Sequence, residues 1–194
     1  MSKDVWLIVG LGNPGPGYSG NRHNVGQMVL DTLAKRIGAS FKAHKSNSVV
    51  AEARLGFGGP KIVLAKPLSY MNTSGGPVAN LAKFYSVDPS QIVVVHDELD
   101  IDPHQVRIKF GGGHAGHNGL RDIIAALGTQ EFVRVRVGIG RPPGRMEVAD
   151  FVLKDFSSIE RKSLPVTLEI AADAVEAIVQ GGVLAAQQKF NSPA

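Results

Sequence analysis

The chain has 194 residues, of which 43% are hydrophobic and 20% charged, so it can bury a substantial core and has an ordinary globular composition. It contains no cysteine, which excludes disulfides, thiolate zinc sites and a thiol nucleophile. No apolar run approaches the roughly 20 residues of a membrane span, and the N-terminus leads into a strand-like segment without a signal peptide. We therefore expect a cytoplasmic protein that is not bound to a membrane.

The formal net charge of +4 is unevenly distributed along the chain. Seven basic residues and only two acids fall between Arg107 and Arg145. An excess of arginine beside glycine-rich loops suits a partner that carries phosphate groups. A solvated surface face explains the same bias equally well, so the charge alone leaves both interpretations open.

In the first half of the chain, strands and helices are predicted to alternate. A buried strand is expected at residues 7–11, and apolar residues at helical spacing predict a helix over 24–37, which Gly38 ends. Strand-like runs at 49–54 and 62–66 flank a turn at 56–60 and predict a hairpin. A second helix is expected to begin at Ser74, which can cap it.

The second half continues the alternation. Strands are expected at 92–95, 106–110 and 132–139, with a helix at 120–127. The sequence SSIE at 157–160 is a capping box that opens a helical region reaching Gln180, which Pro165 should break or kink, and a last helix covers 184–190. We predict an α/β fold in a single domain over residues 1–194, with a mixed, mostly parallel twisted sheet flanked by helices.

The glycines after the first strand match a dinucleotide-binding fingerprint only superficially. Gly10, Gly12 and Gly15 have the required spacing, but the third glycine should open a helix, and Pro14 and Pro16 keep the chain irregular. The acid expected about 20 residues further on, at the end of the next strand, is also missing. Binding of a nicotinamide or flavin cofactor is therefore disfavoured.

Polar side chains gather in the loops that follow the predicted strands, and such loops can converge at one edge of a sheet. With no cysteine and no Gly-x-Ser-x-Gly elbow, water is the favoured nucleophile for attack on an acyl carbon. His23 is the candidate base, since a neutral imidazole can accept a proton near neutral pH. Asp97, just past a strand, is the candidate carboxylate that orients it. Amide groups that could orient a peptide or steady an oxyanion are supplied by Asn13, Asn72 and Asn118.

Each of these residues also has an ordinary structural explanation. His23 fits a surface loop, Asp97 a turn, and Asn118 a helix cap. His114 and His117 have the spacing of zinc ligands, but no third ligand stands at a standard distance in the sequence, so no metal site is predicted. Roles in turns or in packing are open for Asn13, Tyr70 and Met71.

Taken together, four long motifs resemble bacterial peptidyl-tRNA hydrolase, in family order and with family spacing. They read GLGNPGxxYxxNRHNxG at 10–26, KPxxYMNxSG at 66–75, HDELD at 96–100 and GGGHxGHNGL at 111–120. RVGIGRP at 136–142 and FVLxxF at 151–156 extend the resemblance to nearly the whole chain. Asn21 and Ser69 stand where threonine is more usual and Arg107 where lysine is common, and all three keep the polarity or charge.

The resemblance implies a monomeric enzyme without a cofactor that hydrolyses the ester between a peptide and tRNA, with transient ribosome contact. It places the base at His23, its carboxylate partner at Asp97, and the discrimination of blocked from free aminoacyl groups at Asn13. Residues implied to contact the acyl group or the tRNA 3′ end are Tyr18, Tyr70, Met71, Asn72, His117 and Asn118. Those implied to hold tRNA phosphates are Arg107, Lys109 and Arg136. A non-catalytic RNA-binding protein is the alternative, and it would not need the pair of His23 and Asp97.

Overall fold

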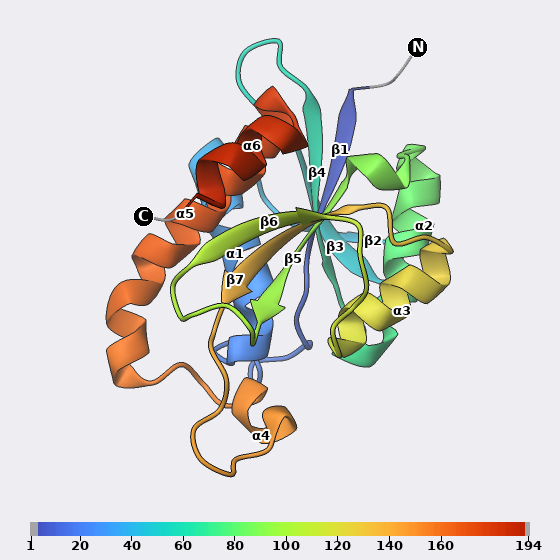
Figure 1. Ribbon diagram of the computed structural model, residues 1–194. Helices are drawn as coiled ribbons and strands as arrows, with labels where there is room; N and C mark the ends of the chain where they lie inside the picture. The colour runs from blue at the N-terminus through green and yellow to red at the C-terminus, as the bar shows by residue number, and fades with distance from the viewer. Residues whose placement is uncertain (1–3, 193–194) are drawn as a thin grey trace.

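Seven strands form one twisted mixed sheet, in the order β2-β3-β4-β1-β5-β7-β6, in the computed structural model, which describes residues 4–192 (Figure 1). The four strands β4, β1, β5 and β7 run parallel, whereas β2, β3 and β6 join them antiparallel at the two sides. This arrangement confirms the predicted α/β fold. The strands are β1 (Val5–Gly10), β2 (Lys42–His44), β3 (Ser48–Arg54), β4 (Lys61–Pro67), β5 (Ile92–Glu98), β6 (Val106–Phe110) and β7 (Val133–Gly138).

Helices cover both faces of the sheet, which is why its central strands are apolar on both sides (Figure 1). Val93 and Val95 of β5 belong to the core under α1 (Val25–Ile37), α5 (Ser158–Gly181) and α6 (Val183–Phe190). Ile92 and Val94 face the other core, under α2 (Gly75–Tyr85) and α3 (Asn118–Leu127). Between residues 4 and 192, no helix combines the length and the apolarity that a membrane crossing requires.

A close approach of α1 to the sheet fixes the segment around His23. Gly26 lies in the first turn of α1, and a Cβ atom there would come within 2.1 Å of the carbonyl oxygen of Val95. On β1, a Cβ at Gly10 would come within 2.5 Å of the Gly26 carbonyl oxygen. Only glycine allows the helix to lie this close, so the first turn of α1 packs directly against the middle of β5.

Three local features differ from what the sequence predicts. Ser74 does not cap α2, because its hydroxyl donates to the Met71 carbonyl oxygen, and the carboxylate of Asp122 accepts from the first N–H of the helix instead. Pro165 does not break α5, which is continuous; the proline lies on the exposed face, where water can replace the lost bond to the Arg161 carbonyl. Asp97 lies inside β5 rather than beyond it.

Candidate active site

Two loops, the start of α3 and a short helix converge beyond the carboxyl ends of the central strands. They enclose a cavity of about 450 Å³. The loop after β1 contributes Asn13 and His23, and a 3-10 turn after β4 (Met71–Thr73) contributes Met71 and Asn72. Asn118 reaches the cavity from the start of α3. The opposite wall belongs to α4 (Val148–Val152), a short helix beyond the ends of the central strands (Figure 1).

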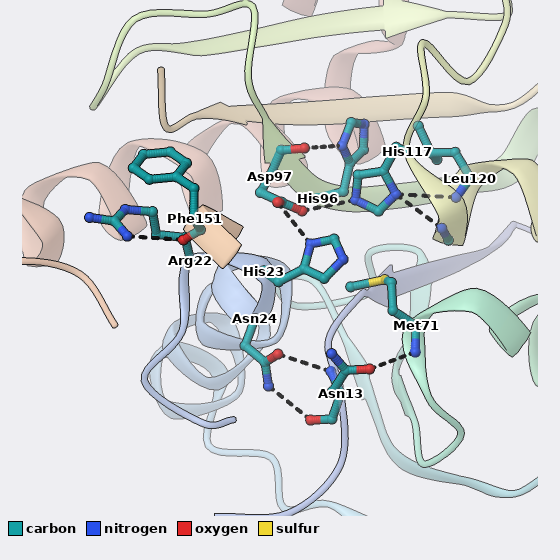
Figure 2. Close-up of polar contacts among 11 residues, drawn as sticks. Asn13, Arg22, His23, Asn24, Met71, His96, Asp97, His117, Leu120 and Phe151 are labelled. Atoms are coloured by element: carbon teal, nitrogen blue, oxygen red, sulfur yellow. Dashed lines mark hydrogen bonds and ion pairs between the residues drawn. The ribbon is translucent and has the colours of Figure 1, made fainter. Parts of the chain in front are cut away.

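His23 and Asp97 are paired, as the sequence predicts (Figure 2). The Nδ1 atom of His23 lies 2.9 Å from Oδ2 of Asp97. An ionised carboxylate can only accept a hydrogen bond, so Nδ1 carries the proton. In the neutral imidazole, Nε2 therefore keeps its lone pair on a residue that lines the cavity. The arrangement is that of a general base held by a carboxylate.

A second imidazole, that of His117, donates to the other oxygen of Asp97. Its Nε2 lies 2.8 Å from Oδ1 of the carboxylate. Its Nδ1 accepts from the backbone N–H groups of Gly119 and Leu120, so His117, not Asn118, caps α3. Burial alone would raise the pKa of the Asp97 carboxyl, but the two imidazoles hold it well below its usual range. Asp97 is therefore ionised at neutral pH.

The pKa of His23 is raised above its ordinary value of 6.5. Burial acts to lower it, but the charge of Asp97 and the hydrogen bond to it outweigh the burial. His23 is therefore a stronger base than a free imidazole, and it becomes the neutral, proton-accepting form at a pH above 6.5.

A third histidine, His96, is buried beside this pair, and its ring centroid lies 5.0 Å from that of His117. Its Nδ1 donates to the carbonyl oxygen of Asp97 at 2.7 Å, and its Nε2 is buried without a protein partner. Burial, with repulsion from His117 and Arg134, lowers the pKa of His96 to about 3. His96 is therefore neutral at physiological pH, and its ring packs against that of His117.

The side-chain amide of Asn13 is fixed in one orientation (Figure 2). Its Oδ1 accepts from the backbone N–H of Met71 at 2.7 Å, and a backbone N–H can only donate, so the oxygen must face Met71. Its backbone is held by Asn24, whose side chain exchanges two 2.9 Å hydrogen bonds with the backbone N–H and carbonyl of Asn13. The Nδ2 group of Asn13 is thus left as the donor available to a bound molecule.

Of the remaining residues predicted to bind the acyl group or the 3′ end, Tyr70, Met71, Asn72 and Asn118 line the cavity, whereas Tyr18 and His117 are not among its lining residues. Tyr70 is 59% exposed, and the Tyr18 ring stands edge-on to it at 6.3 Å between centroids. Met71 is buried, and its sulfur lies against Gly119 at the start of α3, so packing accounts for that side chain. The Nε2 atom of His117 is already hydrogen-bonded to Asp97.

The predicted phosphate-binding residues lie outside the cavity, on the outer end of the sheet. Arg107 and Lys109 of β6 pair in register with Arg136 and Arg134 of β7, so the four side chains share a face. Arg134 is buried and donates to the carbonyls of Gly112, Gly113 and Gln130, which assigns it to the glycine-rich loop rather than to a ligand.

Some features of the site have no signal in the sequence. The first motif contains Asn24, but nothing in the motif indicates that its side chain holds the backbone of Asn13. The buried His96 looks like a further loop residue in the sequence. The α4 wall has five residues, too few to show a helical period.

Within residues 4–192, the side chains close enough to share a metal ion are His23, Asp97 and His117, whose ligand atoms lie within 4.8 Å of one another. Their mutual hydrogen bonds account for this proximity. His114 is not part of the group, and its Nδ1 accepts from the backbone of Gly116.

Comparison with known proteins agrees with the geometry. A sequence profile of the family described as peptidyl-tRNA hydrolase matches residues 7–194. The chain is 65% identical over 189 residues to peptidyl-tRNA hydrolase of Arthrobacter sp. strain FB24, with 97% of each chain covered. It is 60% identical over 197 residues to that of Kineococcus radiotolerans, covering 99% of this chain and 100% of the relative. A crystal structure of peptidyl-tRNA hydrolase from Acinetobacter baumannii has a TM-score of 0.90 at 38% identity and covers 99% of this chain and 97% of its own.

Proposed function

The chain belongs to the peptidyl-tRNA hydrolase family, and from that premise we propose how its site hydrolyses the ester between an N-blocked aminoacyl or peptidyl group and tRNA. The observation that carries the mechanism is the hydrogen bond between Nδ1 of His23 and Asp97. This bond leaves the Nε2 lone pair free to accept a proton in the cavity, and Asp97 makes the imidazole a stronger base. A non-catalytic RNA-binding protein would not require this pair.

In the proposed reaction, Nε2 of His23 takes a proton from water as the water oxygen attacks the ester carbon. The tetrahedral intermediate carries its negative charge on the former carbonyl oxygen, within reach of amide donors such as those of Asn72 and Asn118. When the intermediate collapses, the bond to the ribose oxygen breaks and the protonated His23 returns its proton to that oxygen. Asp97 stabilises the imidazolium in between.

The direct test is hydrolysis of N-acetyl-aminoacyl-tRNA by the purified protein, without added nicotinamide. Release of free tRNA and the acetylated amino acid supports the proposal. Binding of tRNA without turnover would instead favour the RNA-binding alternative. That residues 1–194 form one domain and that the protein is cytoplasmic stay predictions from the sequence, whereas a monomeric state and transient ribosome contact stay predictions that rest on the resemblance.

Asn13 is proposed to select the blocked amino group through its free Nδ2. An N–H donor can bind the carbonyl oxygen of a peptide or acetyl group. It cannot hydrogen-bond to the ammonium of a free aminoacyl ester, because both groups are donors. Asn13→Asp keeps an acceptor for the Met71 N–H but turns a carboxylate oxygen toward the substrate. We expect this variant to lose discrimination, measured as the ratio of the rates on acetylated and free aminoacyl-tRNA. An unchanged ratio would move the selection elsewhere, for example to Asn72.

Arg107, Lys109 and Arg136 are proposed to hold tRNA phosphates. Burial lowers the pKa of Arg136, and Arg107 lowers it further against the opposing effect of Glu98, so an anion placed here would relieve the repulsion. A-form RNA is recognised mainly through its backbone, and charges at fixed spacing suit that task.

The double substitution Arg107→Ala with Lys109→Ala should raise KM for peptidyl-tRNA far more than KM for a short peptidyl-nucleotide ester that lacks the stem. Each charge removed should also lower the salt slope of tRNA binding by about one unit. Lys35→Ala with Lys42→Ala removes two exposed charges elsewhere and is the matched control. Equal losses on the two substrates would refute the phosphate role.

A further inference from the structure

The α4 wall of the catalytic cavity cannot hold its position by itself. Ala149, Val152 and Leu153 line the cavity, and Val148 and Val152 line a smaller one beside Asp97. The helix has five residues, and a helix this short is unstable in isolation. Its distance from His23 must therefore be set by contacts with the rest of the fold.

Phe151 and Val152 of α4 are buried in the core, and the polar contacts of the helix centre on Arg22, the residue before His23. Its buried guanidinium donates to the carbonyl oxygen of Phe151 at 3.0 Å and lies 4.1 Å from the centroid of the Phe151 ring (Figure 2). The same group donates to Glu160 of α5 at 2.6 Å. Glu160 in turn accepts from the backbone N–H of Ser157 in the capping box of α5. We call Arg22, Phe151 and Glu160 the Arg22 tie.

The backbone reinforces the same junction. The N–H of Arg22 donates to the carbonyl of Lys154 at 3.1 Å, and the N–H of Phe156 donates to the carbonyl of Gly20 at 3.3 Å. Asn21 donates from its side chain to Asp155 at 2.7 Å. The segment that leads into His23 is thus joined to the segment that leaves α4.

We propose that Arg22 is a positioning residue that fixes α4 at the distance from His23 at which the cavity holds the ester for attack. Arg22 lines neither cavity, so its effect passes through α4. An arginine is required because its planar fork bonds a carboxylate and a carbonyl at once and stacks on a ring, which a lysine cannot do. The kinetic consequence rests on the proposed hydrolysis, whereas the position of α4 does not.

The experiment compares Arg22→Gln with Arg36→Gln. Arg36 also joins an early helix to α5, through ion pairs with Glu169, Asp173 and Glu176, but it touches no part of α4 or of the catalytic cavity. Both variants lose a guanidinium that is paired with α5, but Arg22 is buried and Arg36 is exposed, so urea unfolding of each variant is measured to account for the difference in stability. Hydrogen exchange of residues 148–154 and steady-state kinetics on N-acetyl-aminoacyl-tRNA are measured for each.

In Arg22→Gln we expect faster exchange across α4 and a fall in kcat/KM of about 10- to 100-fold, carried largely by KM, with the pH midpoint of kcat unchanged. Arg22→Lys should be intermediate, since it keeps a charge for Glu160. Arg36→Gln should leave KM and the exchange of α4 as in the wild type. Partial unfolding would lower the apparent kcat without raising KM.

An unchanged KM in folded Arg22→Gln, or an equal rise in Arg36→Gln, would overturn the proposal. If Arg22→Gln does not fold, Glu160→Gln takes its place, because its amide oxygen can still accept from Ser157. If the wild type does not hydrolyse the ester, the proposed function is wrong. Hydrogen exchange of residues 148–154 then still tests whether Arg22 holds α4 in position.

Discussion

Replacing His23 by alanine is expected to slow hydrolysis of peptidyl-tRNA by about 10²–10⁴-fold, the usual contribution of a positioned general base. Binding of tRNA should persist, because the basic face on β6 and β7 is built from other residues. The fold should also persist, since His23 is a partly exposed residue in a short turn. Single-turnover hydrolysis separates the chemical step from binding. Near-normal hydrolysis by a folded His23→Ala enzyme would contradict the assignment.

Asp97→Asn tests the electrostatic half of the same pair. The base form of His23 is the active one, so kcat/KM of the wild type should rise with pH and level off above a midpoint higher than 6.5. An amide removes the charge that raises the pKa of His23, so the midpoint should move to lower pH while the plateau rate falls. The amide also offers one acceptor to two N–H donors, which forces one imidazole to change tautomer. An unshifted midpoint would show that another group controls the profile.

Acid should destabilise the protein through His96. Its pKa is about 3 in the fold, against 6.5 for an ordinary histidine. Above pH 6.5 the His96 imidazole is neutral in both the folded and the unfolded protein, so its titration does not change the stability. As the pH falls from 6.5 toward 3, the unfolded chain gains a proton that the folded protein does not accept, so stability declines by up to about 5 kcal/mol. His23 acts in the opposite sense, because its raised pKa favours the fold at low pH.

His96→Asn separates the two effects, because an asparagine can replace the Nδ1 donor to the Asp97 carbonyl without being titratable. Urea unfolding at pH 7 and pH 4.5 gives the loss of stability on acidification for each protein. The wild type should lose about 3 kcal/mol more than the variant, which corresponds to two pH units of one additional proton. Equal losses in both proteins would mean that His96 does not control acid unfolding.

The helices and strands that the sequence predicted correctly are those whose spacing of apolar residues, caps and turns match the way they pack in the fold. The helix over 24–37, with its glycine end, and the capping box at 157–160 are both confirmed. The hairpin of β3 and β4 is confirmed as well. β2 and α4 were missed because three and five residues are too few to show a period. β5 proved longer than predicted because its last residues, His96 to Glu98, are polar.

The candidate site was predicted as a set of residues but not as a network. The loops after the strands placed His23, Asp97 and Asn13 together, because the carboxyl ends of parallel strands share one edge of a sheet. Nothing in the sequence indicated that His117 would share the carboxylate or that His96 would be buried under it. Such bonds depend on side-chain directions that only the packed fold determines. The phosphate-binding role of Arg107, Lys109 and Arg136 stays a prediction.

The orientation of Asn13 comes from the main chain at position 71, and this has a consequence for how the protein tolerates mutation. Every amino acid except proline offers the same N–H there, so the amide keeps its direction whichever side chain follows Tyr70. Changes at position 71 can therefore alter packing against Gly119 while the proposed selection of blocked aminoacyl groups by Asn13 is kept. Met71→Pro is the one substitution at that position that should compromise the choice directly.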